Sequence, residues 1–307
     1  MSETEARHVS GFVSILGRPN AGKSTLLNAL VGMKVAIVAD KPQTTRTSIQ
    51  GVLTEPGFQI VFLDTPGIHK AGGSIQKRMM DAVRNALDER DVLLFLVDAS
   101  VPFHDADRKA VSLLQKSDAP AIVVFNKIDL VKEKAKLLPL IEEYRKLHPF
   151  AAFVPISAHK GEGLEELKKE VVERLPEGPR YFPEDHITDQ PERFLAAELI
   201  REKALLLTRE EVPHSIAVLI DRWEDTPQIT RIYSTIFVER DGQKRILIGA
   251  KGSMLTRIGA LAREEMEKIL GRKIYLSLFI KVQPDWREKA AFLNAIDWRT
   301  MTGADEN

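Results

Sequence analysis

Short apolar runs alternate with helix-like stretches along the first 175 residues of the chain. The runs 92–97 and 121–125 are continuously apolar and 11–16 is interrupted by Ser14; all three contain β-branched residues, as in strands buried on both faces. Between such runs, apolar residues recur at the spacing of amphipathic helices. This pattern predicts an α/β domain over residues 10–175, built as a doubly wound sheet with helices on both faces.

The alternation stops at residue 175. Residues 176–191 contain four prolines, and because each proline fixes φ and lacks an N–H, we predict a semi-rigid linker. A smaller α+β domain is predicted over residues 192–283, followed by a tail of residues 284–307; residues 1–9 are predicted to form a polar N-terminal tail. The expected elements of the smaller domain are a helix at 192–208, strands at 215–220 and 229–238, a short helix or strand at 246–248, a helix at 253–270 and a strand at 273–282.

The most specific motif follows the first apolar run. Residues 17–24 read Gly-Arg-Pro-Asn-Ala-Gly-Lys-Ser and fill every fixed position of the phosphate-loop pattern GxxxxGK[ST], between a strand-like and a helix-like segment. The alternative is a chance glycine-rich turn. In a phosphate loop, Lys23 would reach the β- and γ-phosphates and the Ser24 hydroxyl would ligate Mg²⁺. The nucleotide-binding residues predicted in this segment are Gly17, Arg18, Pro19, Asn20, Ala21, Gly22, Lys23, Ser24 and Thr25.

A second motif selects the base. Asn126, Lys127 and Asp129 form an NKxD tetrad with Ile128, directly after the run 121–125, at the strand end where open α/β sheets bind ligands. Asp129 can accept hydrogen bonds from the ring N–H and the exocyclic amine of guanine, whereas adenine would leave this carboxylate unpaired. Lys127 is expected to lie along the base, and Asn126 to tie this loop to the phosphate loop. Alone, the tetrad would equally suit a polar turn; after a phosphate loop it predicts a guanine nucleotide.

Two further motifs lie between the phosphate loop and the tetrad. Asp64-Thr65-Pro66-Gly67 ends the strand-like run 59–63; Asp64 is expected to hold Mg²⁺ through a water, and the Gly67 N–H to face the γ-phosphate. Thr45, within the preceding segment 42–46, supplies a hydroxyl to a loop that can close over Mg²⁺.

A final short motif, Ser157-Ala158, ends the apolar run 152–155 and can contact the guanine O6 through its backbone. The order of the five motifs resembles that of the small GTPase domain throughout residues 10–175. The resemblance implies Lys23, Thr45 and Gly67 as catalytic residues and Ser24, Thr45 and Asp64 as metal-binding residues. It adds Asp64, Thr65, Pro66, Gly67, Asn126, Lys127, Asp129, Ser157 and Ala158 to the nucleotide-binding set.

Composition adds mainly exclusions. The chain has no cysteine, which excludes disulfides, thiol catalysis and cysteine-ligated zinc and is compatible with a reducing cytoplasm. Its seven histidines are scattered without a metal-binding spacing. The first seven residues are polar and acidic, unlike a signal peptide. The longest apolar run, 92–97, is too short to span a bilayer.

In the smaller domain, Gly249-Ala250-Lys251-Gly252 matches the GxxG loop of KH RNA-binding domains, in which two glycines let the backbone approach nucleic-acid phosphates. A single GxxG can also be a helix cap or a hairpin turn. The element order is that of the second KH topology, and residues 240–273 hold nine basic against four acidic residues. The predicted RNA-binding residues are Gly249, Ala250, Lys251, Gly252, Lys244, Arg245 and Arg257.

The phosphate-loop sequence, Pro-Gln-Thr-Thr-Arg at 42–46 and a KH-like domain ending in Pro-Asp-Trp-Arg at 284–287 together resemble the Era family of bacterial ribosome-assembly GTPases over nearly the whole chain. The resemblance implies binding of GTP and GDP with Mg²⁺, and slow GTP hydrolysis. It also implies binding of 16S ribosomal RNA near its 3′ end and a role in assembly of the 30S ribosomal subunit. A cytoplasmic monomer with peripheral contact to the inner face of the cell membrane is expected.

The chain departs from the small-GTPase pattern at Ile68, where those enzymes commonly place a glutamine that orients the attacking water. No side-chain amide is available there, so slow intrinsic turnover is expected; the Era family shares this replacement. Relatives that use K⁺ carry an asparagine that matches Asn20. Asn20 either helps to hold K⁺ or only stabilises the loop, and the sequence leaves both open.

Two other functions stay open at this point. The chain could be a non-catalytic RNA-binding assembly factor gated by nucleotide. It could also be a related GTPase acting in RNA modification, which would need a catalytic domain beyond the GTPase domain.

Overall fold

The computed structural model describes residues 8–41, 43–68, 72–88, 90–208, 212 and 215–298. The chain divides into two compact units, the first comprising residues 1–36, 45–70 and 78–189 and the second residues 37–44, 71–77 and 190–307. Pro42, His69, His214, the N-terminal tail up to residue 7 and the C-terminal tail from residue 299 lie outside the described residues. The domain limits drawn from the sequence stay predictions. Two short segments, 37–44 and 71–77, cluster with the second unit although they precede the linker.

The first unit is built on a six-stranded sheet with the order β2-β3-β1-β4-β5-β6. The strands are β1 (Val9–Gly17), β2 (Ile49–Glu55), β3 (Phe58–Asp64), β4 (Val92–Asp98), β5 (Ala121–Asn126) and β6 (Ala152–Pro155). All neighbours pair in parallel except β2, which is antiparallel to β3. β4 and β5 are buried along almost their whole length, which explains their uninterrupted apolar sequences.

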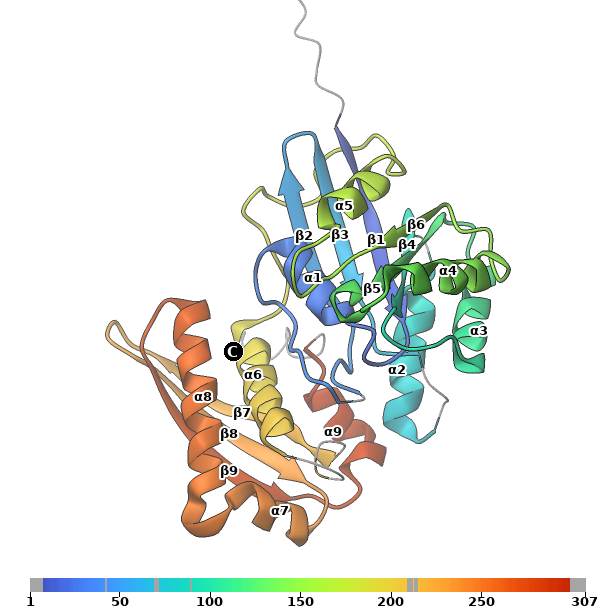
Figure 1. Ribbon diagram of the computed structural model, residues 1–307. Helices are drawn as coiled ribbons and strands as arrows, with labels where there is room; N and C mark the ends of the chain where they lie inside the picture. The colour runs from blue at the N-terminus through green and yellow to red at the C-terminus, as the bar shows by residue number, and fades with distance from the viewer. Residues whose placement is uncertain are drawn as a thin grey trace, which may run out of the picture. The chain divides into compact units, whose positions relative to one another are not determined.

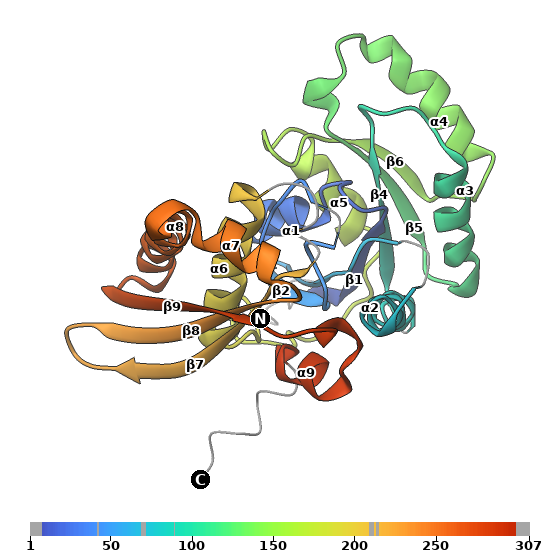
Figure 2. The same ribbon diagram turned by 90° about the horizontal axis from the view of Figure 1, so that it is seen from below.

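Helices cover both faces of this sheet (Figure 1). They are α1 (Lys23–Val31), α2 (Ser74–Asn85), α3 (Asp105–Val111), α4 (Leu137–Arg145) and α5 (Leu164–Val172). Figure 2 shows α1 and α5 on one side of the strands and α3 and α4 on the other. On the latter side Tyr144 of α4 packs edge-on against Phe125 of β5, within a core that also contains Val83 of α2. The predicted doubly wound sheet is confirmed.

The sequence analysis predicted no strand at residues 49–55, where the structure places β2. Ile49 and Val52 are buried, but Gly51 and polar residues interrupt the apolar pattern of this antiparallel edge strand. A Cβ on Gly51 would lie 2.8 Å from Leu27 Cδ1 of α1, so packing of the helix favours glycine there. The local sequence pattern therefore does not reveal this strand, and its glycine is explained only by packing against α1.

The proline-rich segment 176–189 runs along the sheet of the first unit. The Ser10 N–H donates to the Pro176 carbonyl (3.1 Å), and the Val52 N–H donates to the Ile187 carbonyl (2.8 Å). The Gln59 side chain accepts from the N–H groups of Tyr181 and Phe182. Because a proline-rich backbone cannot form its own ladder, strands β1 to β3 supply its hydrogen bonds.

The second unit contains a three-stranded sheet with the order β7-β8-β9, in which β8 is antiparallel to β7 and parallel to β9. Its elements are α6 (Glu192–Leu207), β7 (Ala217–Asp225), β8 (Thr230–Val238), α7 (Asp241–Ile248), the 3₁₀ turn η5 (Ala250–Gly252), α8 (Ser253–Leu270), β9 (Ile274–Val282) and α9 (Ala290–Ala295). Residues 246–248, which fitted either a helix or a strand by sequence, belong to α7. The predicted element order is thus confirmed, while β7 extends five residues past the predicted end of its strand, from 220 to 225.

α6 and α8 pack against one face of this sheet (Figure 1). Their core contains Ile200 of α6, Ile258 of α8 and Ile236 of β8, all fully buried. Ile37, from the short segment 37–44, belongs to the same core. Among the described residues, no helix has the length and apolar character needed to cross a membrane.

Candidate functional site

The phosphate loop lies between the end of β1 and the start of α1, as its motif predicts. Gly17 and Gly22 have φ of 146° and 94°, in the region that favours glycine. A Cβ on Gly17 would lie 2.4 Å from the Leu96 carbonyl oxygen, and one on Gly22 would lie 2.3 Å from Asn126 Nδ2. Both glycines are therefore required by close neighbours as well as by the turn.

Lys23 is a buried cation at the first position of α1. Its Nζ donates to the carbonyls of Gly17 (3.1 Å) and Arg18 (3.0 Å), inside the loop. Burial lowers the pKa of Lys23 to about 8, and the nearby Asp64 carboxylate opposes this shift. Because its hydrogen bonds within the described part of the chain go to neutral carbonyls, this buried ammonium is suited to binding an anion.

Three oxygen-bearing side chains meet beside Lys23. Ser24 Oγ donates to Asp64 Oδ2 (2.6 Å) and lies 2.8 Å from Thr45 Oγ1, which is 3.4 Å from the same carboxylate oxygen. Asp64 is fully buried, and its Oδ1 has no hydrogen-bond partner among the described residues. Burial raises the pKa of Asp64 to about 6, while Lys23 lowers it. Hydroxyl and carboxylate oxygens are the ligands that a hard divalent cation prefers, so this set fits Mg²⁺.

The segment after β3 lies against the phosphate loop. The Thr65 hydroxyl donates to the Ile15 carbonyl of β1 (2.9 Å), and the Ile68 N–H donates to the Gly17 carbonyl (3.0 Å). A Cβ on Gly67 would lie 2.7 Å from Pro19 Cα. The DxxG segment therefore adjoins the loop closely enough for its backbone to face a bound phosphate.

The NKxD tetrad joins three loops. Asn126 donates from Nδ2 to the Ala21 carbonyl (2.9 Å) and accepts at Oδ1 from the Ala158 N–H (2.9 Å). The predicted tie from Asn126 to the phosphate loop is confirmed. Asp129 Oδ1 accepts from the Ser157 hydroxyl (2.6 Å), which orients the carboxylate. In the structure, Ser157 and Ala158 thus both form hydrogen bonds with side chains of the tetrad.

Sequence reasoning missed two supporting residues of this site. Asp98, the last residue of β4, pairs with Lys127 Nζ at 2.7 Å. Asp107 of α3 pairs with Arg18 Nη1 at 3.0 Å. Asp98 ends an apolar strand at the same sheet edge as the tetrad, and that position was a usable signal; nothing in the sequence marks Asp107.

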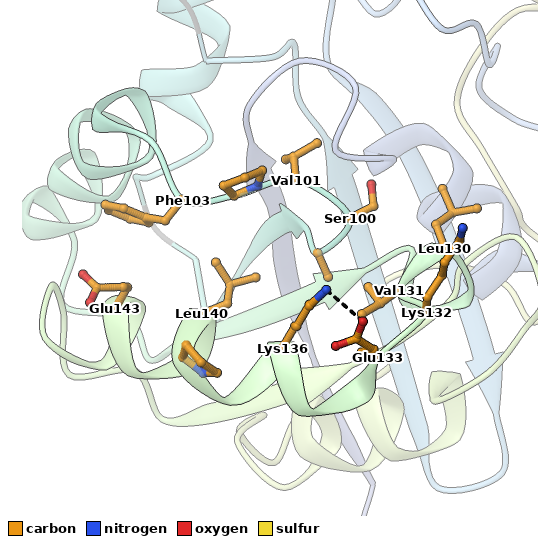
Figure 3. A pocket seen from close by; sticks show the side chains of 13 residues that line it. Ser100, Val101, Phe103, Leu130, Val131, Lys132, Glu133, Lys136, Leu140 and Glu143 are labelled. Atoms are coloured by element: carbon orange, nitrogen blue, oxygen red, sulfur yellow. Dashed lines mark hydrogen bonds and ion pairs between the residues drawn. The ribbon is translucent and has the colours of Figure 1, made fainter.

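Of the other predicted nucleotide-binding residues, Pro66 and Ala21 are buried, Thr25 lies in the first turn of α1, and Asn20 is exposed with φ of 63°. A cavity of about 530 Å³ is lined by Phe103, Val131 and Leu140, among others (Figure 3). None of the predicted nucleotide-binding residues lines it. The residues predicted to bind the nucleotide lie instead around the phosphate loop.

The GxxG loop separates α7 from α8 in the second unit. Gly249 and Gly252 have φ of 70° and 83°, and Lys251 between them also has a positive φ, 51°. A Cβ on Gly249 would lie 2.7 Å from Met254 Cβ. Ala250 and Lys251 are exposed at the N-terminus of α8. An exposed lysine and the positive end of the α8 dipole therefore lie in the same loop.

Basic residues surround this loop. Arg245 and Arg257 are exposed and Lys244 is half-buried. Two apolar side chains, Ile246 of α7 and Leu261 of α8, are 51% and 38% exposed. Sequence reasoning did not single them out, because a helical apolar residue is usually part of a core.

Comparisons with known proteins agree with this geometry. A family model described as a 50S ribosome-binding GTPase matches residues 12–127, and a KH-domain model matches residues 211–287. The chain is 48% identical to a GTPase Era of Geobacter metallireducens over 291 residues, which cover 94% of this chain and 97% of the relative. A GTPase Era of Lactobacillus delbrueckii is 47% identical over 95% of this chain and 97% of its own.

Two solved structures are similar over at least 94% of the chain. A single-residue variant of Aquifex aeolicus Era bound to GDP and AlF₄⁻ has a TM-score of 0.91 at 45% identity, covering 94% of this chain and 99% of its own. An Era complex with MgGDPNP and nucleotides 1506–1542 of 16S ribosomal RNA has a TM-score of 0.92 at 45% identity, covering 95% and 99%. The motifs, the two units and these similarities lead to one conclusion: the chain is a GTPase that belongs to the Era family.

Proposed function

We propose that this GTPase acts as a nucleotide-controlled switch that binds 16S ribosomal RNA near its 3′ end and assists assembly of the 30S subunit. The nucleotide part of this proposal rests on the cluster of Ser24, Thr45 and Asp64 beside the buried Lys23. In this cluster Asp64 Oδ1 has no hydrogen-bond partner among the residues that the structure describes. The Era complex with MgGDPNP and a 16S fragment supports the RNA half, because its whole chain resembles this one.

In the proposed site, Lys23 and the loop N–H groups hold the β- and γ-phosphates. Ser24 and Thr45 ligate Mg²⁺ through their hydroxyls, and Asp64 does so through a water. When bound, Mg²⁺ neutralises charge on the phosphate oxygens during phosphoryl transfer. The Asp129 carboxylate, oriented by Ser157, accepts hydrogen bonds from guanine.

Hydrolysis in this site is proposed to be slow. The Gly67 N–H faces the γ-phosphate, but Ile68 offers no side-chain amide to orient the attacking water. Asn20, exposed on the loop, is a candidate to hold K⁺ near the phosphates, where a monovalent cation would offset the charge that develops in the transition state. The rate of GTP hydrolysis by the chain alone should therefore depend on which monovalent cation is present.

The RNA site is proposed at the GxxG loop. The Lys251 ammonium and the N-terminus of α8 contact phosphates, with Lys244, Arg245 and Arg257 extending the basic surface. The exposed Ile246 and Leu261 offer apolar surface to unstacked bases. We place this activity in the cytoplasm, with the chain as a monomer that makes peripheral contact with the inner face of the cell membrane.

The proposal is tested by measuring GTP hydrolysis with and without 30S particles, together with RNA affinity in GDP and in a non-hydrolysable GTP analogue. We expect 30S particles to stimulate hydrolysis and the GTP analogue to strengthen RNA binding. Thr45→Ala should remove the difference between the two nucleotides while leaving GDP affinity within about twofold, because this hydroxyl acts only when a γ-phosphate orders its loop. Absence of stimulation, together with unchanged RNA affinity in Thr45→Ala, would favour a binding factor in which hydrolysis is incidental.

A further inference from the structure

The segment 37–44, which immediately precedes Thr45, is anchored within the second unit on helix α6. Its first residue, Ile37, is buried in the core formed by α6, α8 and the three-stranded sheet. Near this end, the Val38 N–H donates to Glu202 Oε1 of α6 (2.8 Å). At the other end, the Thr44 carbonyl accepts from Arg201 Nη2. Two adjacent residues of one helix therefore hold the main chain at both ends of this segment.

The two anchoring side chains are themselves fixed. Arg201 is 1% exposed, and its guanidinium forms a two-point pair with Glu198, one turn earlier in α6 (2.5 and 2.7 Å). Glu202 is 2% exposed and pairs with Lys203, which also pairs with Glu265 of α8. Each anchoring side chain is thus restrained by a partner of opposite charge. This restraint reduces the side-chain entropy that is lost when the anchor binds the segment.

A purely structural role accounts poorly for these charges. Burying an ion pair is unfavourable by several kcal/mol per ion unless its geometry is excellent, and apolar residues of similar size often stabilise a core better. Both anchors bond to main-chain atoms, so they fix the path of the segment whatever its side chains are. The arrangement is suited to holding a loop in place more than to strengthening α6.

The peptide bond between Thr44 and Thr45 transmits this anchoring to the metal-binding set. Because a peptide group is planar, the Thr44 carbonyl and the Thr45 N–H lie in one plane, and a hydrogen bond to the carbonyl restrains that plane. Within the restrained backbone, φ and χ1 of Thr45 aim its hydroxyl. In the structure that hydroxyl lies 2.8 Å from Ser24 Oγ.

We propose that Arg201 and Glu202 are positioning residues for GTP hydrolysis, which hold segment 37–44 so that the Thr45 hydroxyl is placed for the metal and the γ-phosphate. This inference rests on the proposed role of Thr45. It assigns to α6 of the second unit a part in the chemistry of the first, through the chain rather than through contact with the nucleotide. Loss of an anchor should lower the rate of the chemical step more than the affinity for GDP, because GDP does not need Thr45.

The test compares Arg201→Met and Glu202→Met with wild type in the full-length chain. Two quantities are measured: single-turnover hydrolysis at saturating GTP and Mg²⁺, and affinity for a fluorescent GDP analogue. We expect at least a tenfold slower chemical step and GDP affinity within about twofold. Glu202→Gln keeps an acceptor oxygen for the Val38 N–H and should retain most of the rate. Glu192→Ala, on the exposed N-terminal turn of the same helix where it pairs with Arg272, is the matched control and should behave as wild type.

A second measurement separates this inference from the proposed function. Amide hydrogen exchange of residues 38–46 should accelerate in both methionine variants and not in Glu192→Ala or Glu202→Gln, with or without nucleotide. Unchanged exchange in a folded methionine variant overturns the anchoring, and faster exchange with an unchanged hydrolysis rate overturns the positioning role. Neither result would touch the proposed function, which is decided by whether 30S particles stimulate wild-type hydrolysis and by whether RNA affinity depends on the nucleotide in wild type and not in Thr45→Ala. If Arg201→Met does not fold, the two Glu202 variants decide the question alone.

Discussion

At the scale of single residues, the nucleotide site holds charges that weaken the fold. Lys23 and Asp64 are both buried, and burial favours the neutral form of each side chain. It lowers the pKa of Lys23 to about 8 and raises the pKa of Asp64 to about 6. Natural folds tolerate such unfavourable groups where a ligand relieves them, because a phosphate chain and a cation restore the missing partners. The site is thus organised for its ligand at the expense of the ligand-free protein.

The burial of Asp64 predicts that the stability of the folded chain depends on pH. The pKa of Asp64 is about 6 in the folded chain and 3.8 when unperturbed. Between these values the folded chain holds a proton that the unfolded chain has released, so stability from this group is present below pH 3.8 and lost as pH rises through 6. Asp64→Asn does not titrate. Without nucleotide, its stability relative to wild type should therefore increase from about pH 4.5 to about pH 7, by roughly 2 kcal/mol.

Urea denaturation followed by circular dichroism measures this difference; tryptophan fluorescence would not, because all three tryptophans lie beyond residue 192. Asp88→Asn, at an exposed position of the first unit, is the control for loss of a negative charge. A stability increment for Asp64→Asn that is the same at every pH would contradict the prediction.

A second prediction at this scale concerns the base. In Asp129→Asn the new amide cannot accept from both guanine donors, so GTP affinity should fall by about two orders of magnitude or more, because buried polar groups are left unpaired. Xanthosine triphosphate carries a carbonyl where guanine has its amine and should bind the variant better than it binds wild type. Competition binding with the two nucleotides measures the change, and Asp118→Asn, at an exposed position, is the control. A variant that keeps the wild-type preference would show that the tetrad does not read the base.

At the scale of elements, both candidate sites lie where a loop meets a helix N-terminus. The phosphate loop precedes α1 and the GxxG loop precedes α8, and positive-φ glycines allow each close turn. In the GxxG loop, Lys251 has a φ of 51°, is exposed and lies two residues before the start of α8. The two loops thus share one physical principle, the positive end of a helix dipole, on two different folds.

The double variant Ala250→Asp with Lys251→Asp tests the second loop. Two negative charges would then face the RNA phosphates, so affinity for the 3′ end of 16S ribosomal RNA should fall at least tenfold while GTP affinity stays unchanged. Arg263→Asp with Lys268→Asp, in the last turns of α8, is the control. It changes the net charge by more than the test variant does, so a simple loss of net charge would affect it more strongly. RNA affinity unchanged in the loop variant, with its fold intact, would show that the loop is only a helix cap.

At the scale of the whole molecule, each of the two compact units is made of several separate stretches of the chain. Segments 37–44 and 71–77 belong to the second unit, although the chain around them belongs to the first. The segment before Thr45 is therefore shared: its main chain is held by Arg201 and Glu202, and the next residue joins the metal-binding set. If Thr45 acts as proposed, this shared segment would connect the nucleotide site to the second unit through the chain itself.

The sequence by itself determined the chemistry of the nucleotide site and most of the element order. A phosphate loop, DxxG and NKxD each act through a few neighbouring residues on a strand end, so their spacing is enough to identify them. The buried strands β4 and β5 were equally visible, because burial on both faces leaves an unbroken apolar run. The type of α7 was left open, since residues 246–248 suit a helix or a strand and their environment decides.

Tertiary structure alone decided the features that depend on distant partners. Asn126 contacts Ala21, 105 residues away along the chain, and Arg201 contacts Thr44, 157 residues away. A local sequence pattern does not predict such contacts. β2 was not predicted for a similar reason, because the glycine that interrupts its apolar pattern, Gly51, packs against Leu27 of α1, far from it in the sequence. Local propensity and periodicity report on neighbours along the chain, whereas burial, ion pairing and anchoring are set by which elements the fold brings together.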